Sequence, residues 1–347
     1  MINGAILALA AVGAGVVLFV AHWTVQFLTF HLFTPSEPLK AYKRPGKDAY
    51  ALVTGASAGI GLGIARELVR QGFGVVLLGH LADELAAAAA DLRRETPGAK
   101  VHTLVLDART ATGDDIIAAI NTSLPPMLDL TILVNNVGGN PVADPAFRAH
   151  ATYTPADVDA VINQNARFMA RLTALLLPRL GASASASASA SASASSASGG
   201  LQQQQRSLVL TISSGAYVGV PWLVMYAATK AFNRALGTGL ARELPLCPDT
   251  AAVDSLVVLP GEVRSQGNCR GVPASAPSAD QFGRLIVRKV DGALRNGWRE
   301  MRPHWWHGIE AVLLRTVPES VRTKGLAEQL GAKKEAWDEF LAKDKKN

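Results

Sequence analysis

The chain begins with one long apolar segment. Residues 1–36 contain no Asp, Glu, Lys or Arg, and the apolar run from Ala5 to Val20 continues as far as Phe33. A helix needs about 20 apolar residues to cross the hydrocarbon core of a bilayer, and this segment is longer. A secretory signal peptide would carry a basic start and a small-residue cleavage site, which the segment lacks. We therefore predict a transmembrane helix that anchors the chain.

A basic linker over residues 37–47 follows the apolar segment. Its cations are Lys40, Lys43, Arg44 and Lys47, whereas only the amino terminus is charged on the other side. Because the cytoplasmic flanks of membrane spans are enriched in Lys and Arg, we expect the rest of the chain in the cytosol. The low count of two cysteines is weak support for a reducing compartment.

Apolar runs of strand length then alternate with longer, helix-like segments. The predicted strands are Ala49 to Thr54, Gly74 to Leu78, Lys100 to Asp107, Leu130 to Asn135, Ser207 to Ser213 and Val253 to Leu259. The predicted crossover helices include Ile60 to Gln71, Asp83 to Glu95, Ala156 to Leu177 and Tyr226 to Leu244. This alternation is typical of a parallel sheet with helices on both faces. The fold class is therefore α/β, a doubly wound parallel sheet in a single domain over residues 48–300, followed by a C-terminal segment over residues 301–347.

One segment interrupts this rhythm. Residues 181–205 are an Ala-Ser alternation that ends in two glycines, a leucine and four glutamines. Ala and Ser bury too little apolar surface to offset the entropy of ordering. We predict a disordered low-complexity insertion in a surface loop.

The net charge of the chain excludes few classes of function. The chain has 34 Lys and Arg against 28 Asp and Glu, a net charge of +6. This excess suits attraction to anionic lipid headgroups, a cofactor 2′-phosphate or a CoA thioester, or it simply solvates and orients the linker and the Lys-rich tail. No nucleic-acid motif accompanies it, so we expect no nucleic-acid partner, and we expect no metal.

A glycine-rich turn closes the first predicted strand. It runs Thr54-Gly-Ala-Ser-Ala-Gly-Ile-Gly61 and opens the next helix. Glycines at this place let a pyrophosphate approach the N-terminus of the helix. The alternative, glycines that only pack a strand against a helix, is less consistent with their position between the two elements. The candidate cofactor-binding residues of the turn are Gly55, Ser57, Gly59, Ile60 and Gly61.

Tyr226 and Lys230 stand four residues apart at the start of a predicted helix, so their side chains share one face. A phenol with a pKa of about 10 is a poor acid-base catalyst near neutrality, but an adjacent ammonium would lower that pKa. Such a pair can also occur by chance on a solvated helix face. Ser213 and Ser214, which close the preceding strand, favour the catalytic interpretation.

Four motifs in this order resemble the classical short-chain dehydrogenase/reductases. They are the glycine-rich turn, Asn135-Asn136-Val137-Gly138, Ser213-Ser214 and Tyr226-Ala-Ala-Thr-Lys230. The details resemble one branch, the microsomal very-long-chain 3-ketoacyl-CoA reductase and 17-beta-hydroxysteroid dehydrogenase type 12 group, which also carries an N-terminal span. The resemblance implies a Rossmann-type domain and makes Asn135, Asn136 and Gly138 cofactor-binding residues.

The resemblance also implies catalytic roles. Tyr226 would protonate the carbonyl oxygen, and Lys230 would hold the cofactor ribose and lower the tyrosine pKa. A serine would polarise the ketone: the sequence context favours Ser214, whereas the spacing to Tyr226 favours Ser213. Asn165 would hold a water of the proton relay, with its neighbour Asn163 as the second choice.

Cofactor choice is read at the end of the second strand, where an acidic residue would accept the ribose of NAD. His80 stands there, so NADP(H) is expected, although a neutral imidazole would bind the phosphate less firmly than the branch's arginine. By the same resemblance Asp107 would contact the adenine, with a simple cap or strand end as the alternative. Val263 and Ser265 would open the cofactor lid.

The expected reaction is reduction of a 3-ketoacyl-CoA to the 3-hydroxyacyl-CoA in very-long-chain fatty-acid elongation, with other elongation enzymes as candidate partners. A steroid or secondary-metabolite ketone is the alternative, and an inactive membrane scaffold is a third. Residues 301–347 hold Trp305 and Trp306, which suit a membrane interface or a packed core. The tail Lys343 to Asn347 fits the Lys-x-Lys-x-x retrieval pattern, so we expect the endoplasmic reticulum membrane with the catalytic domain cytosolic.

Overall fold

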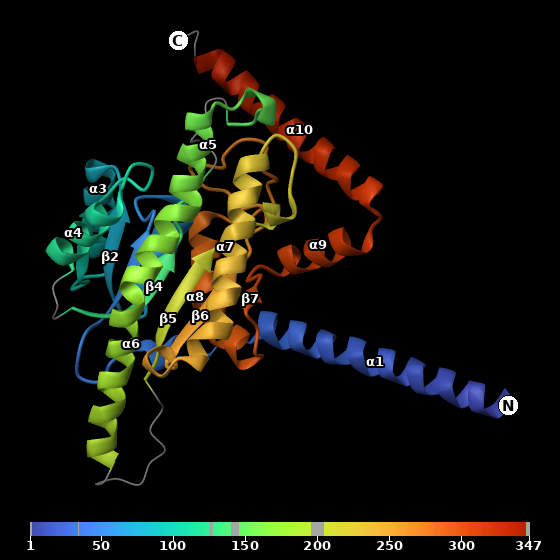
Figure 1. The fold of residues 1–347 in the computed structure, drawn as a ribbon, viewed down its shortest axis with the longest axis horizontal. Coiled ribbons are helices and arrows are strands. Elements are labelled where there is room, and N and C mark those ends of the chain that lie inside the picture. The colour runs from blue at the N-terminus through green and yellow to red at the C-terminus, as the bar shows by residue number, and fades with distance from the viewer. Residues whose placement is uncertain (1, 34, 125–127, 140–145, 196–204, 345–347) are drawn as a thin grey trace.

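A seven-stranded parallel sheet forms the centre of the molecule (Figure 1). The computed structural model describes residues 2–33, 35–124, 128–139, 146–195 and 205–344. The strand order is β3-β2-β1-β4-β5-β6-β7. The strands are β1 (Ala49–Thr54), β2 (Gly74–Gly79), β3 (Val101–Val105), β4 (Asp129–Asn135), β5 (Ser207–Ile212), β6 (Val253–Val258) and β7 (Glu300–Met301). All six predicted strands and the doubly wound class are confirmed, whereas β7 was not predicted because two residues make no recognisable apolar run.

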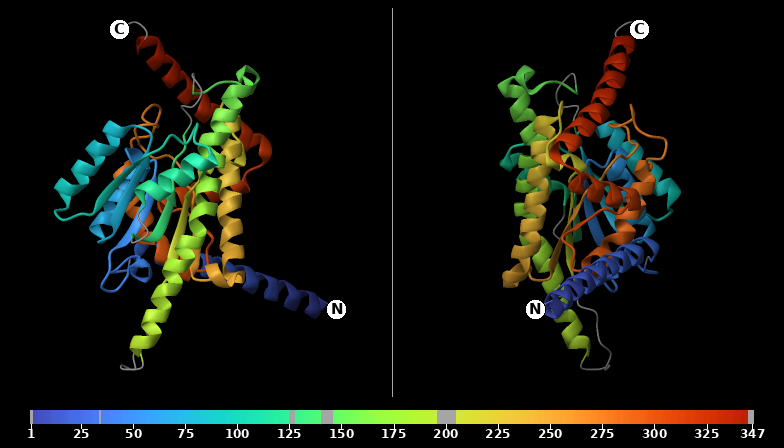
Figure 2. Two further views of the ribbon diagram at one scale, coloured as in Figure 1. Left: turned by 60° about the vertical axis from the view of Figure 1, so that its left-hand side comes forward. Right: turned by 90° about the vertical axis from the view of Figure 1, so that its right-hand side faces the viewer.

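Helices cover both faces of this sheet (Figure 2). One face carries α2 (Gly59–Arg70), α3 (Ala82–Glu95) and α8 (Ala279–Arg295). The other carries α4 (Gly113–Ser123), α6 (Phe168–Ser195) and α7 (Val224–Glu243). The shorter helical elements are α5 (Pro155–Ile162), a π-helical turn η3 (Asn163–Arg167) and the 3₁₀ turns η1 (Lys40–Tyr42), η2 (His150–Thr152), η4 (Gly215–Val218), η5 (Leu244–Leu246) and η6 (Pro248–Thr250).

The central strands are rich in apolar residues because both of their faces are covered. In β4, for example, Ile132 and Val134 belong to the core under α2 and α8, while Leu130 and Leu133 belong to the core under α6. This pattern places the two hydrophobic cores on opposite sides of one sheet and leaves its carboxyl edge for polar loops.

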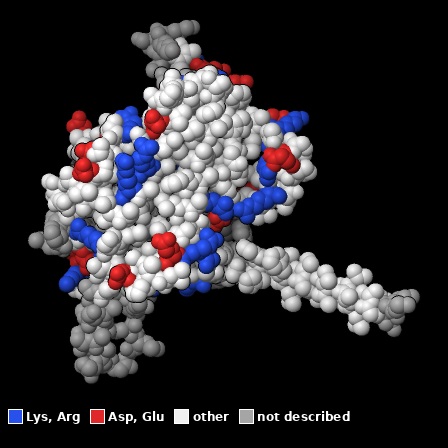
Figure 3. Space-filling model, in the orientation of Figure 1, with Lys and Arg blue, Asp and Glu red and all other residues white. Residues whose placement is uncertain are grey.

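The N-terminal helix α1 (Ile2–Leu32) leads away from this domain (Figure 1). Its segment Gly4–Leu32 is long and apolar enough to cross a membrane, and its most apolar part is not buried against the rest of the chain. Figure 3 shows no charged atoms along it. The predicted helix is confirmed, and its length and composition fit a membrane span.

The predicted disorder of residues 181–205 was wrong for its first part, because α6 continues through Ser195. Alanine is the strongest helix former, so an Ala-Ser run extends a helix that is already nucleated. The extension is also packed at its start: a Cβ on Gly181 would lie 2.1 Å from the carbonyl oxygen of Asp249, and Ala184 is buried. Residues 196–204 lie outside the described part.

The C-terminal segment forms two helices, α9 (Trp305–Thr316) and α10 (Glu319–Asp344). Helix α10 packs on the rest of the domain. Its Leu330 is buried against a small apolar cluster that includes Phe147 and Leu223. Residues 345–347 of the Lys-rich tail lie outside the described part.

Candidate active site

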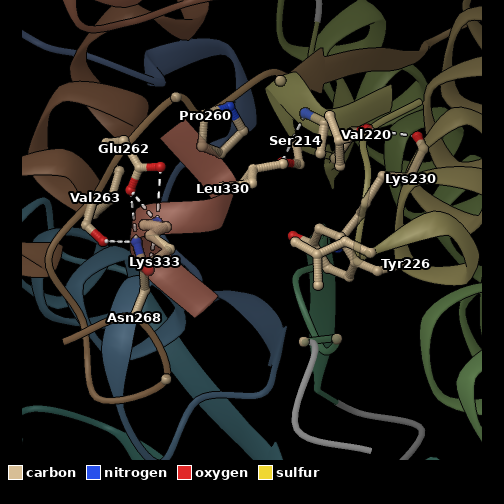
Figure 4. Close-up of a pocket in the computed structure, with 18 of the residues that line it drawn as sticks. Ser214, Val220, Tyr226, Lys230, Pro260, Glu262, Val263, Asn268, Leu330 and Lys333 are labelled. Atoms are coloured by element: carbon tan, nitrogen blue, oxygen red, sulfur yellow. Dashed lines mark hydrogen bonds and ion pairs between the residues drawn. The ribbon is translucent and has the colours of Figure 1, made fainter. Parts of the chain in front are cut away.

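A cavity of about 410 Å³ lies at the carboxyl ends of the central strands (Figure 4). Its walls come from the loops that follow β4, β5 and β6, from α7, and from the C-terminal helices α9 and α10. In a doubly wound sheet this edge is where ligands bind. Most of the sequence-predicted catalytic residues line the cavity or lie directly beneath it.

The glycine-rich turn between β1 and α2 forms one end of the site. Gly55 and Gly59 have φ angles of +63° and +60°, which favour glycine. A Cβ on Gly61 would lie 2.2 Å from the carbonyl oxygen of Gly55, so the turn has no space for a side chain there. No side chain caps the first turn of α2, which leaves its backbone amides to an anionic ligand. Within the same turn Ile60 lines the cavity, whereas Ser57 is partly exposed.

The two asparagines after β4 have different roles in the structure. Asn136 donates from Nδ2 to the carbonyl oxygens of Thr54 and Gly55, at 2.9 and 3.2 Å, and so fixes the glycine-rich turn. Asn135 is turned away from the cavity and donates to the Thr173 hydroxyl on α6 at 2.8 Å. Its side chain therefore supports the fold, in contrast to the cofactor contact that the resemblance implied.

Asn165 lies in the π-helical turn that interrupts the predicted continuous helix between residues 156 and 177. Its carboxamide is fully buried, accepts from the Gly139 amide at 2.8 Å and donates to the Gly139 carbonyl at 3.2 Å. A Cβ on Gly138 would lie 2.5 Å from Asn165 Oδ1 and 3.1 Å from Lys230 Nζ. Asn165, Gly138 and Lys230 thus converge, whereas Asn163 accepts a hydrogen bond from Arg167 outside this cluster.

Tyr226 and Lys230 face each other from the first turns of α7. The Lys230 ammonium is buried and lies 5.5 Å from the centre of the Tyr226 ring. Burial lowers the pKa of Lys230 to about 8. The pKa of Tyr226 is raised by burial, lowered in part by the Ser214 hydroxyl and raised by the carboxylate of Glu262. The sequence predicted a lowered tyrosine pKa, and this was wrong for the protein alone because desolvation by burial is the largest effect on this phenol.

The two candidate serines point in different directions. The Ser213 hydroxyl is buried and donates to the carbonyl oxygen of Lys230 at 2.6 Å. Ser214 lies on the cavity wall beside Tyr226 (Figure 4), where its hydroxyl accepts from the Ala216 amide at 3.2 Å. Only Ser214 therefore has a hydroxyl group placed to reach a ligand near Tyr226.

The opposite wall was missed by sequence reasoning. Lys333 of α10 donates to both carboxylate oxygens of Glu262, at 2.8 and 2.6 Å, and to Asn268 Oδ1 at 2.9 Å (Figure 4). Glu262 and Asn268 belong to the loop after β6 that also carries Val263 and Ser265. The pair joins residues 71 positions apart, so no local pattern in the sequence points to it.

A group of charges lies at the carboxyl ends of β2 and β3. Arg109 binds Asp107 with two nitrogens, and this hydrogen bonding lowers the pKa of the Asp107 carboxyl, with a smaller contribution from His80. His80 is exposed beside this pair. Arg109 was missed because the resemblance directed attention to position 80. Its guanidinium adds a cation beside His80, at the place where a ribose phosphate would be recognised.

Comparison with known proteins agrees with this geometry. The model of the family described as short chain dehydrogenase matches residues 49–269. A very-long-chain 3-oxoacyl-CoA reductase from Aspergillus clavatus is 29% identical over 324 residues, which cover 89% of this chain and 84% of the relative. A 17-beta-hydroxysteroid dehydrogenase type 3 from Danio rerio is 30% identical over 220 residues, 63% of this chain and 62% of the relative.

Solved structures show the same fold. A short-chain dehydrogenase from Sphingobium yanoikuyae in complex with NADPH superposes with a TM-score of 0.56 at 22% identity, over 78% of this chain and 97% of that one. A short-chain dehydrogenase from Shigella flexneri complexed with NADP superposes with a TM-score of 0.56 at 23% identity, over 72% of this chain and 94% of that one. Both bind a nicotinamide cofactor, and the glycine-rich turn described above fits such a group.

Proposed function

The chain belongs to the short-chain dehydrogenase family of oxidoreductases, and on that basis we propose that it reduces a ketone to a secondary alcohol with NADPH. The observation that carries the proposal is the convergence of Tyr226, Ser214, Lys230 and Asn165 on one cavity beside the glycine-rich turn. A phenol, a hydroxyl, an ammonium and a carboxamide in this arrangement are suited to proton transfer to a bound carbonyl.

Each residue of the site has a chemical task in this proposal. The glycine-rich turn and Lys230 would hold a nicotinamide cofactor, which would supply the hydride for the carbonyl carbon. The Tyr226 phenol, whose pKa is raised by burial, remains protonated near neutrality and donates its proton to the carbonyl oxygen. The Ser214 hydroxyl hydrogen-bonds the same oxygen and polarises it. Lys230 holds the ribose hydroxyls, and Asn165 positions the water that returns a proton to the phenolate.

We propose NADP(H) as the cofactor on the basis of the charges around Asp107. The NADP-bound relatives support a nicotinamide cofactor in general. A 2′-phosphate is favoured here because His80 and Arg109 lie at the strand ends where NAD enzymes place a carboxylate to accept the ribose. Val263, Ser265, Gly59 and Gly61 would enclose the rest of the cofactor.

The proposed substrate is a 3-ketoacyl-CoA, which would be reduced to the 3-hydroxyacyl-CoA in very-long-chain fatty-acid elongation. The proposal is supported by the reductase-named relatives and by the apolar cavity wall of Leu326, Leu330 and Trp337. A steroid or secondary-metabolite ketone is the second candidate, favoured by the similarity to the steroid dehydrogenase. Other elongation enzymes are the proposed partners.

The proposed location is the endoplasmic reticulum membrane with the domain in the cytosol. The apolar helix α1 and the cations of residues 37–47 support this orientation. The sequon at Asn121, which is exposed on α4, provides a test. In microsomes the chain should show no shift on endoglycosidase treatment, and a glycosylated Asn121 would reverse the proposed orientation.

The reductase proposal is tested with microsomes that contain the full chain or Tyr226→Phe. Long-chain 3-ketoacyl-CoA and a steroid ketone are each offered with NADPH or NADH, and cofactor oxidation is followed. The expected result is NADPH oxidation with the acyl-CoA and its loss in Tyr226→Phe, with NADPH binding retained. Equal turnover in the variant would refute the mechanism, and no ketone-dependent oxidation in either protein would favour an inactive scaffold.

A further inference from the structure

The inner end of α1 is packed firmly against the catalytic domain. Phe30 is buried, its ring lies 4.8 Å from that of Trp298, and it contacts Gly292 of α8. Lys289 of α8 donates to the carbonyl oxygens of His31 and Phe33, at 3.1 and 3.0 Å. A cation that binds the last carbonyls of a helix stabilises its end. The direction of α1 relative to the domain is therefore fixed by contacts.

Helix α9 lies beside the apolar part of α1. A Cβ on Gly308 of α9 would lie 3.3 Å from the ring of Phe27. Phe27 is five residues, or about 8 Å, before the end of the apolar segment at Leu32. That segment is about 44 Å long by helix geometry, close to the thickness of a bilayer with its headgroups. The contact thus places α9 at the depth of the headgroup layer.

The two faces of α9 have different surroundings. Trp305, Trp306, Val312 and Leu313 form one face, and each is between 47% and 60% exposed. Residues Glu310 and Leu314 on the other face line the cavity. Figure 1 shows α9 on the side of the domain from which α1 leads away. One short helix therefore separates the cavity from the side where α1 would enter a membrane.

We propose that the exposed face of α9 lies in the cytosolic headgroup layer of the bilayer and that α9 is the membrane-side wall of the cavity, past which lipophilic ketones enter. This inference rests on the proposed membrane anchoring by α1. Indole rings concentrate at this layer, and the exposed Arg315 in the last turn of α9 suits the phosphates beside it. A second copy of the chain is the other conceivable occupant, but the adjacent apolar helix favours lipid.

Spin-label accessibility tests the placement without any need for turnover. The exposed Cys247 and Cys269 are replaced by serine, and a label is attached at Leu313→Cys or, as a control, at Val105→Cys. The two sites are matched, since Leu313 is 53% and Val105 is 54% exposed. In phosphatidylcholine and phosphatidylserine nanodiscs, the label at position 313 should be more accessible to oxygen than to a water-soluble nickel complex, and the order should reverse at position 105.

Nickel accessibility at position 313 equal to that at position 105 would overturn the proposal. Dipolar broadening between labels at position 313 in nanodiscs would also overturn it, in favour of a second copy. As a second measurement, Trp305→Ser with Trp306→Ser should raise the KM for a long-chain ketone and leave the kcat and the KM for a short, water-soluble ketone unchanged. If the wild-type chain reduces no ketone, the reductase proposal fails while the label result still decides the position of α9.

Discussion

The ammonium of Lys230 lies over the ring of Tyr226, 5.5 Å from its centre. A cation in this position is attracted by the face of the ring. Lys230 is also fully enclosed, and burial lowers its pKa from 10.5 to about 8. Burial of the charged Lys230 side chain therefore lowers the stability of the folded protein.

Because the charge on Lys230 depends on pH, its effect on the stability of the folded protein depends on pH as well. Between about pH 8 and 10.5 the unfolded chain keeps the Lys230 proton while the folded chain releases it, so stability from this group rises with pH across that window and is lowest below pH 8. We expect Lys230→Met to raise the thermal unfolding temperature at pH 7, by an amount that shrinks toward pH 10. Thermal unfolding of both proteins at several pH values measures this. An effect of the same size at every pH would show that the charge is not responsible.

The two serines should separate catalysis from stability. Ser214→Ala is expected to reduce kcat strongly with little effect on unfolding, because its hydroxyl faces the cavity. Ser213→Ala should cost about 1 kcal/mol of stability, because a buried hydrogen bond to the Lys230 carbonyl is lost. Steady-state kinetics and denaturant unfolding on both variants make the comparison. If Ser213→Ala lost more kcat than Ser214→Ala, Ser213 would be the catalytic serine instead of Ser214.

Arg109 should contribute to cofactor choice. Removal of a charge-assisted hydrogen bond to a phosphate costs about 1.5–3 kcal/mol, so Arg109→Gln should weaken NADPH binding about tenfold or more. NADH binding should change little, since NADH lacks the 2′-phosphate. Fluorescence titration with each cofactor measures the two dissociation constants, with Arg94→Gln, an exposed α3 residue paired with Asp91, as the control. If Arg109→Gln weakened the binding of NADPH and NADH equally, Arg109 would not recognise the 2′-phosphate.

The ion pair between Lys333 and Glu262 should hold α10 on the cofactor loop. Lys333→Met leaves a largely enclosed carboxylate without its cation, which we expect to destabilise the protein by about 3 kcal/mol. Glu262→Gln combined with Lys333→Met should recover much of this loss. Thermal unfolding of the single and double variants, together with the KM for NADPH, provides the test. Additive losses in the double variant would mean that the two side chains are not coupled.

Much of the fold could be predicted because its strands are buried on both faces. Runs such as Ala49–Thr54 and Ser207–Ile212 are apolar enough to be recognised alone. The short β7 and the extension of α6 could not be recognised in this way. The first depends on pairing with β6, and the second on a nucleated helix that continues through residues without apolar surface.

The candidate site was predictable where its residues belong to local motifs. Tyr226 and Lys230 share a helix face, and the glycine-rich turn is contiguous in sequence. The π-helical turn at Asn165 depends instead on its contact with Gly139, and the wall that contains Lys333 depends on a helix at the far end of the chain. Contacts of this kind arise from tertiary packing, which no local pattern records.

The bond between Lys289 and the end of α1 has a consequence for biosynthesis. Lys289 is made 258 residues after His31, whose carbonyl it binds. At about 5–20 residues per second, the ribosome needs roughly 10 to 50 seconds to add that length of chain. Helix α1 is therefore complete for that time before its docking partner on α8 exists, and its contact with the domain forms only after α8 has emerged and folded.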